Sequence, residues 1–299
     1  MAFNRNLLSN LWWGGVFSFC LWGVASKAIG ETAPTSQTLS GQTKTGIQAT
    51  GYIDLRPSWI TKTGNFTTED TVELGAKLTQ DTSVTYMQGL LTNLYDPMSG
   101  DANGGLKPKL DAGALKVNVK NLWKDDSQGL SLGYENRTYL PVDEASQNRG
   151  MIASIRNYLK LSKKVNDRLQ FTLSEIAIPI VNNRSGVVSK TGEAVANKIF
   201  ENRVYLVTDI QLTEKLALSL PVMFHQSRTA NFRSDASQNA SWSFHVWTSP
   251  ELDYAMSENL TLGVAYYNND SFFTPNLSKS QFGQALESGE FQFVLTASL

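Results

Sequence analysis

The sequence has little cysteine, little charge and, beyond its N-terminus, no long apolar run. Its single cysteine, Cys20, lies in an N-terminal segment that we expect to be removed. Disulfides, thiolate metal sites and a cysteine nucleophile are therefore excluded from the mature chain. Charged residues make up 18% of the 299 residues, below the roughly 25% of average proteins. Because no run of about 18 apolar residues follows the N-terminus, helical membrane spans are excluded from the mature chain.

The chain also lacks the residues that several kinds of site require. The formal net charge is −1, which gives no basic footprint for nucleic acid. Only two histidines occur, His225 and His245, so a histidine-based metal cluster is not expected. No glycine-rich phosphate loop follows a strand and opens a helix. We therefore expect no cofactor, no metal and no nucleic-acid partner.

The first residues have the pattern of a cleaved secretory signal peptide. Arg5 supplies the positive charge, an apolar stretch follows, and Ser26 and Ala28 are the small residues before the cleavage point. A membrane anchor is the weaker alternative, because polar residues interrupt the apolar stretch. The next segment is rich in Thr, Ser, Gln and Gly and has little to bury, so it predicts a flexible leader. The expected signal peptide, leader and folded domain are 1–28, 29–45 and 46–299.

Beyond the leader, apolar and polar residues alternate. In the last segment the apolar residues share the odd positions: Phe291, Phe293, Leu295, Ala297 and Leu299. A period of two is the signature of a strand with one apolar face. Counting such segments predicts about twelve strands. The expected spans are 46–60, 71–80, 83–95, 111–123, 128–140, 151–163, 168–181, 201–212, 216–227, 240–255, 259–269 and 289–299.

The connections between these strands alternate between short and long. The short ones are polar turns at 80–82, 124–127, 165–167, 213–215 and 257–258. The long ones are 61–70, 96–110, 141–150, 182–200, 229–239 and 270–288. This alternation is typical of outer-membrane barrels, which have short periplasmic turns and long extracellular loops. With an even number of strands, both termini are then periplasmic.

A soluble β-sandwich is the main alternative, because its strands alternate in the same way. It explains neither the turn asymmetry nor the strand lengths, which approach the roughly nine to eleven residues of a membrane-crossing strand. Aromatic residues near the strand ends also favour two membrane interfaces. They are Trp59, Tyr95, Phe224, Trp242 and Tyr266 on the long-loop side, and Trp123 and Tyr254 on the short-turn side.

The last nine residues, FQFVLTASL, resemble the C-terminal sorting strand of Gram-negative outer-membrane proteins. Such strands usually end in Phe or Trp, whereas this chain ends in Leu299. The resemblance implies an all-β, transmembrane, antiparallel up-and-down barrel in the bacterial outer membrane. It also implies insertion by the barrel assembly machinery and contact with outer-membrane lipids.

If the apolar face of each strand meets lipid, nearly every strand charge faces the lumen. The expected lumen charges are Asp54, Arg56, Glu73, Lys77, Lys116, Lys120, Glu135, Arg137, Arg156, Lys160, Arg203, Asp209, Glu251 and Asp253. Glu175 is the exception, and the apolar parity of its strand changes from Leu173 to Ile176. A β-bulge near Ser174-Glu175 would correct both. We also expect bulges at Pro221 and Pro250, since proline lacks a ladder donor.

The lumen charges either pair across strands and brace the wall, or form a charged constriction that selects solutes. A barrel of twelve strands is wider than one filled by its own side chains and narrower than an open porin. We therefore expect a porin-like channel, monomeric or trimeric, for passive diffusion of small polar solutes. The alternatives are partial occlusion by 182–200 or by the leader, and a structural or adhesive barrel that acts through its extracellular loops. The candidate selectivity residues are Arg56, Glu73, Lys116, Glu135, Arg137, Arg156, Arg203, Asp209, Glu251 and Asp253.

One short motif suggests an enzyme. His225-Gln226-Ser227 resembles the His-x-Ser of the outer-membrane phospholipase A family, which uses serine as nucleophile and histidine as base. That family continues with Asn-Gly, whereas this chain has Arg228-Thr229, and Ser243 occupies the place of its orienting asparagine. The parity also turns His225 and Ser227 towards the lumen. We therefore expect a non-enzyme without catalytic residues.

Overall fold

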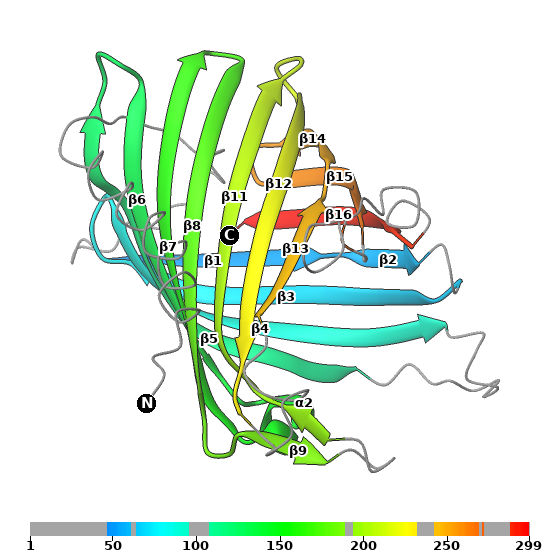
Figure 1. Cartoon of the computed structure of the whole chain (residues 1–299). Helices are drawn as coiled ribbons and strands as arrows, with labels where there is room; N and C mark the ends of the chain where they lie inside the picture. Colours follow the sequence, from blue (N-terminus) through cyan, green and yellow to red (C-terminus); the bar gives the residue numbers. More distant parts are fainter. Residues whose placement is uncertain are drawn as a thin grey trace.

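The chain folds as a closed barrel of twelve antiparallel strands (Figure 1). The computed structural model describes residues 47–60, 64–95, 108–188, 194–231, 242–268, 271 and 288–298. The expected signal peptide and leader lie outside them. The barrel strands are β1 (Gln48–Leu55) with β2 (Pro57–Ile60), β3 (Phe66–Lys77), β4 (Thr82–Tyr95), β5 (Lys109–Asp125), β6 (Leu130–Leu140), β7 (Met151–Asn166), β8 (Leu169–Asn182), β11 (Lys198–Gln211), β12 (Leu216–Thr229), β13 (Trp242–Thr248) with β14 (Glu251–Ser257), β15 (Leu260–Tyr267) and β16 (Glu290–Ser298).

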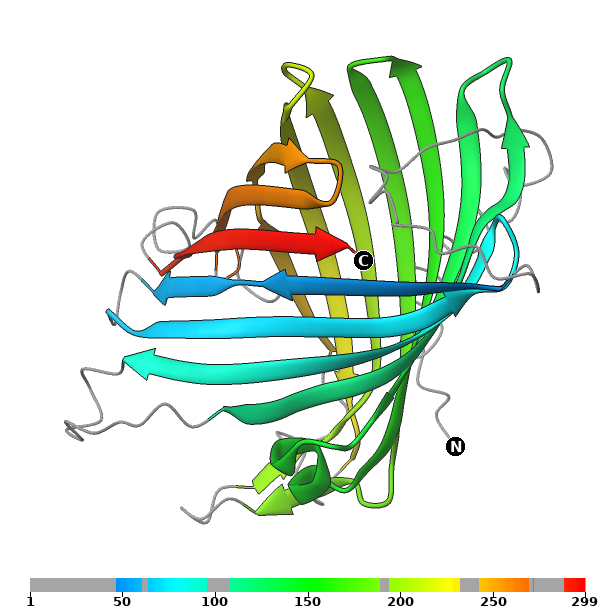
Figure 2. The same ribbon diagram turned by 180° about the vertical axis from the view of Figure 1, so that it is seen from behind.

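The first strand closes the barrel by pairing with its sequence neighbour and with the last strand. Ile53 of β1 pairs with Val72 of β3 on one side and with Ala297 of β16 on the other. After an interruption at Arg56, β2 continues both pairings. Figure 2 shows β1 and β2 between β16 and β3. Closure leaves no free sheet edge, which a spanning structure requires because lipid offers no hydrogen bonds.

The polar turns form because their side chains satisfy the backbone. Between β5 and β6, Asp125 Oδ1 accepts hydrogen bonds from Ser127 N at 2.9 Å and from Ser127 Oγ at 2.5 Å. These bonds, the side-chain one foremost, lower the pKa of the exposed Asp125 carboxyl. Gly129 then takes a φ of 61°, which a glycine adopts without steric cost. All five expected short turns are present between the strands.

One connection that we expected to be long is short. The segment 61–70 was predicted as a loop, but β3 begins at Phe66 and leaves only 61–65 between the strands. Hydrogen bonds from Ile60 N to Asn65 O at 2.9 Å and from Gly64 N to Ile60 O at 2.8 Å close this hairpin. The polar run from Thr67 to Asp70 hides the strand in the sequence, because it has no apolar alternation.

Two other long connections contain structure of their own. The segment 141–150 holds the helix α2 (Glu144–Arg149), which Asp143 caps by accepting a 2.7 Å hydrogen bond from Ser146 N. The segment 182–200 holds the short hairpin of β9 (Gly186–Val188) and β10 (Ala194–Ala196). The Asn197 side chain donates to Arg149 O at 2.7 Å and to Arg184 O at 3.0 Å. The two connections are thereby joined beyond one end of β7 and β8 (Figure 1).

Large apolar side chains cover the outside of the barrel, as the alternation predicts. Leu74, Leu115, Leu206, Phe224 and Phe293 are all exposed. The directly paired residues of an antiparallel sheet share a face, so these positions assign every strand's outer side. The expected interface aromatics Trp59, Trp123, Phe224 and Tyr254 are exposed too.

No helix within the described residues is long and apolar enough to span a membrane.

The expected bulge at Ser174-Glu175 is absent. The pairing of β8 with β11 runs without a shift from Phe200↔Pro179 to Ile210↔Leu169. Glu175 therefore faces outward with Phe171 and Leu173, and Ile176 and Ile178 face inward. The change of apolar parity in β8 reflects apolar side chains inside the barrel, and the backbone stays regular.

The prolines are accommodated by an interruption rather than by two bulges. β12 pairs with β11 in unbroken register through Pro221. The neighbouring strand stops at Thr248 and resumes at Glu251, so Ser249 and Pro250 leave the ladder opposite Pro221. Thr248 Oγ1 donates to Pro221 O at 2.5 Å. The Pro221 nitrogen points to the same side as its carbonyl, so its missing donor faces the interruption.

Candidate functional site: the barrel lumen

A cavity of about 1300 Å³ occupies the lumen on the short-turn side. Side chains from all twelve barrel strands line it, together with turn residues such as Asp81, Asp167 and Glu214. Within the described part of the chain, no lining residue comes from the 182–200 connection. The lining is predominantly polar and charged, as expected for the inward parity.

The structure places most of the predicted selectivity residues around this cavity. Seven of them line it: Arg56, Glu73, Lys116, Arg137, Asp209, Glu251 and Asp253. Glu135 lies directly behind it, bonded to the lining residues Arg137 and Lys160. Arg156 and Arg203 also face inward but lie further towards the long-loop side.

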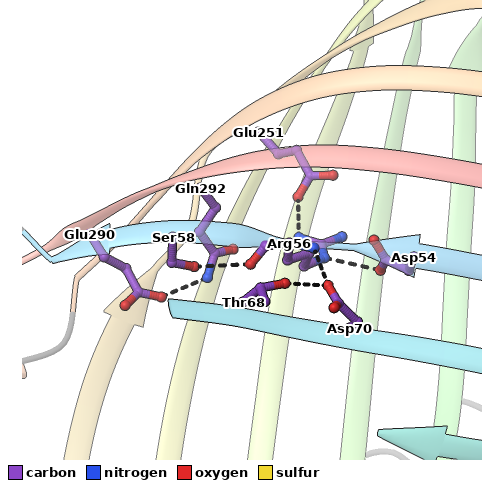
Figure 3. A network of polar contacts seen from close by, with 8 residues as sticks. All are labelled: Asp54, Arg56, Ser58, Thr68, Asp70, Glu251, Glu290 and Gln292. Atoms are coloured by element: carbon purple, nitrogen blue, oxygen red, sulfur yellow. Dashed lines mark hydrogen bonds and ion pairs between the residues drawn. The ribbon is translucent and has the colours of Figure 1, made fainter. Parts of the chain in front are cut away.

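One group of carboxylates surrounds Arg56, where the first strand is interrupted (Figure 3). Arg56 Nε lies 3.0 Å from Asp54 Oδ2, and Arg56 Nη1 lies 3.0 Å from Glu251 Oε2. The Arg56 backbone N donates to Asp70 Oδ1 at 3.3 Å. We call the carboxylates Asp54, Glu251 and Asp253 the acidic arc. Arg56 crosses β16 and β15 to reach β14, so it braces this part of the wall.

Residues of β15 and β16 without long side chains leave room for the ion pair between Arg56 and Glu251. Gly263 of β15 and Val294 of β16 pair directly and face the lumen between β14 and β1. A Cβ on Gly263 would lie 2.2 Å from Asp253 Oδ1. Val294 is 2% exposed, so the inner wall is closely packed here.

Cations dominate the lumen face of three neighbouring strands. We call this set the basic arc: Lys116 and Lys120 on β5, Arg137 on β6, and Arg156, Lys160 and Lys164 on β7. Lys116 pairs with Glu73 across β4, and Glu135 lies between Arg137 and Lys160, whose Nζ is 2.9 Å from Glu135 Oε2. Glu135 is 5% exposed, so it neutralises part of the arc from within the wall.

Arg156 differs from the lumen arginines Arg56, Arg137 and Arg203 because no described carboxylate pairs with it. Its guanidinium lies 3.9 Å from the centroid of the Tyr139 ring. Its Nε is buried without a hydrogen-bond partner. The pairing of Glu201 with Ile178 and of Asn157 with Ala177 places Ile178 between Arg156 and the Glu201 carboxylate. Arg137 on β6 pairs directly with Arg156 and is a second cation. The positive charge here is therefore only partly compensated.

The two arcs lie on opposite walls. In the closed order of strands, β6 and β15 are six strands apart in both directions. The basic arc is centred on β6, and the acidic arc flanks β15 on β14 and β1. Of the strands between the two arcs, β4, β8 and β12 line the cavity with uncharged side chains such as Thr85, Gln170 and Ser219, whereas β3 contributes Glu73 and Lys77, and β11 contributes Asp209. The lumen charges therefore segregate, and they create a field directed across the passage.

Above the cavity, towards the long loops, lumen-facing side chains form an apolar belt. We define the belt as Met87, Tyr139, Ile176, Ile178 and Met223, all 7% exposed or less. Met87 and Tyr139 pack together with Ala114. The sequence signal was the apolar parity of Ile176 and Ile178, which we interpreted as a bulge. Met87 also lines the cavity, so the belt borders it.

A second carboxylate cluster lies on β11 and β12, beside the belt residues Ile176 and Ile178. Glu201 accepts from Lys198 at 2.8 Å and from Arg203 at 2.7 Å, and His225 Nε2 lies 3.2 Å from it. His225 also stacks with Trp247 at 5.1 Å between centroids. The Arg203 charge is therefore satisfied locally, and Asp209 accepts from Ser219 at 2.7 Å.

The residues that resemble the phospholipase motif lie inside the barrel. His225 and Ser227 are 5% and 4% exposed, and Ser227 Oγ is 2.7 Å from Ser243 Oγ. This arrangement presents neither side chain to lipid on the outer wall. Among the described residues, no group of three or more metal-ligating side chains is placed to hold a metal.

The class of protein that this geometry defines is a closed twelve-stranded antiparallel barrel with a charged lumen. No protein-family model and no curated protein sequence matches the chain. Among the solved structures that resemble it are an outer membrane channel and a porin. One is the COG4313 outer membrane channel from Pseudomonas putida F1, with 10% identity and a TM-score of 0.55, covering 90% of this chain and 100% of that one. The other is a NanC porin, with 11% identity and a TM-score of 0.51, covering 82% and 98%. These likenesses establish the barrel fold.

Proposed function

We propose that the chain is a porin-like channel of the bacterial outer membrane for passive diffusion of small polar solutes. The observation that carries the proposal is the cavity of about 1300 Å³, which all twelve strands line. Its lining is polar and charged, unlike a core that only fills a barrel. The exposed apolar outer surface supports a lipid surrounding.

The opposed arcs give this channel a means of discrimination. A dipolar or zwitterionic solute lowers its energy when it aligns between the basic and acidic walls. The apolar belt, which borders the cavity, then limits the size of what passes. Outer-membrane lipids, the barrel assembly machinery and the solutes are the partners that this function requires.

The test is the conductance of the purified, refolded protein in planar lipid bilayers. We expect discrete steps in potassium chloride, and a non-zero reversal potential in a salt gradient because the arcs do not neutralise each other locally. Barrel formation is checked separately by heat-modifiable migration in gel electrophoresis. A folded barrel without conductance steps would contradict the channel and favour a barrel that acts through its loops.

A further inference from the structure

A row of four amide side chains and one alanine crosses the outer surface of five adjacent strands. Asn136 of β6 pairs with Asn157 of β7, which pairs with Ala177 of β8. Ala177 pairs with Asn202 of β11, which pairs with Gln226 of β12. Directly paired residues share a face, and this parity also holds the exposed Phe171, Leu206 and Phe224. We call these five residues the outer amide row.

The outer amide row is linked to further polar groups on the same face. Asn157 Oδ1 accepts hydrogen bonds from Asn136 Nδ2 and from Tyr134 OH, both at 2.9 Å. Glu175 pairs with Leu159 and Val204, so it lies diagonally beside both Asn157 and Asn202. The Asn202 Oδ1 atom is buried and has no hydrogen-bond partner. The row therefore holds amide groups and a carboxylate that the barrel itself satisfies only in part.

Apolar side chains flank the row on both sides along the strands. On β8, Phe171 and Leu173 precede Glu175, and Val181 follows the row. On β11, Leu206 lies on the short-turn side and Phe200 on the long-loop side. Leu206 and Val181 are 47% and 45% exposed. The polar row thus lies within the apolar band, where lipid tails offer neither donors nor acceptors.

We propose that the outer amide row is the contact surface for a second copy of this chain. The inference depends on the proposed membrane-spanning function. Amides both donate and accept, so a row of them is complementary to itself, which an interface about a two-fold axis requires. A two-fold axis near Ala177 crosses the two rows at their smallest residue and lets the backbones approach closely. The amides of one copy then surround Glu175 of the other.

A second copy fits this row better than a lipid headgroup does. A headgroup site for an anionic lipid needs basic side chains, whereas the row carries none and includes the acid Glu175. The outward-facing Arg228 lies at the edge of the face and is already stacked on the Trp242 ring at 5.5 Å. Polar side chains between membrane segments stabilise their association, and here they are arranged across five strands.

The test uses crosslinking on a background without cysteine, which Cys20→Ser provides. We expect Ala177→Cys to form a disulfide-linked dimer in outer-membrane vesicles under mild oxidation. Leu262→Cys is the matched control: it is outward-facing and 41% exposed, but it lies on β15, four strands from β8 and outside the row, and should stay monomeric. Copper phenanthroline is the oxidant, and gel migration without reductant is the readout.

A second variant tests the amides themselves. Asn157→Leu combined with Asn202→Leu should lower the dimer fraction at least tenfold in native mass spectrometry, while heat-modifiable folding persists. A wild-type monomer at all concentrations, with no Ala177→Cys dimer, overturns the proposal. A monomer that loses bound lipopolysaccharide in the double variant also overturns it and assigns the row to lipid. Conductance is measured on the same samples, so a conducting monomer contradicts only the two-copy interface, and a silent dimer only the channel.

Discussion

The lumen arginines differ in what surrounds each guanidinium, and this difference separates bracing from selectivity. Arg56 is held between Asp54 and Glu251 at 3.0 Å from each. Arg203 is paired with Glu201 at 2.7 Å. Arg156 has only the Tyr139 ring, because Ile178 separates it from Glu201. An arginine keeps its charge at any working pH, so only a cation without a carboxylate acts fully on passing ions.

Arg156→Gln should shift the ion selectivity of the channel towards cations. A unit charge about 4 Å from an ion in water changes its energy by about 1 kcal/mol, which is roughly a fivefold change in local ion concentration. Reversal potentials in a potassium chloride gradient measure the shift. Barrel stability should stay close to that of the wild type, since no carboxylate loses a partner.

Arg56→Gln should instead lower the stability of the barrel. Its loss leaves Asp54, Glu251 and Asp253 without their shared cation, so we expect a loss of about 2 kcal/mol in the free energy of unfolding. Urea unfolding in lipid vesicles, followed by tryptophan fluorescence, gives this value. Unchanged stability would mean that Arg56 does not brace the wall.

Unchanged selectivity in Arg156→Gln would remove that residue from the selectivity site.

At the scale of the strand, close approach of neighbouring backbones depends on single glycines. Gly75 of β3 lies opposite Thr85 of β4. A Cβ at Gly75 would lie 2.3 Å from Val84 O and 2.7 Å from Thr85 Cα. Both are backbone atoms, so β3 and β4 would have to separate to admit a methyl group.

Gly75→Ala should therefore destabilise the barrel by about 1–3 kcal/mol, the usual cost of overpacking. Gly89→Ala is the matched control in β4, because the new methyl group would first meet the Asp111 side chain at 3.1 Å, which can move. The unfolding midpoint in urea distinguishes the two variants. Equal midpoints for both would show that the strands adjust without cost at Gly75.

At the scale of the whole molecule, the barrel has two different ends. At one end tight turns connect the strands, and the other end carries α2 and the hairpin of β9 and β10. In the proposed outer-membrane setting, the turn end is periplasmic and the hairpin end is extracellular.

Surface labelling of intact cells tests this orientation. An epitope inserted after Val188, at the end of β9, should be accessible to antibody. One inserted between Asp125 and Asp126 should be accessible only after the outer membrane is permeabilised. The reverse pattern would overturn the orientation, and with it the assignment of the basic and acidic arcs to the periplasmic half.

The sequence by itself determined the number of strands and the inward side of every strand except β8, because alternation and polar turns are local properties. Charges such as Lys116, Glu135 and Asp253 had to face inward, since a charge at the lipid midplane costs roughly 2–4 kcal/mol. Only the tertiary structure decided where these charges lie around the circumference. Closure and register bring Arg56 to Glu251 and set β6 opposite β15, across separations that no local pattern encodes. The same holds for Glu175 and the inward Ile178, whose places follow from an unbroken β8 ladder held by its neighbours on both sides.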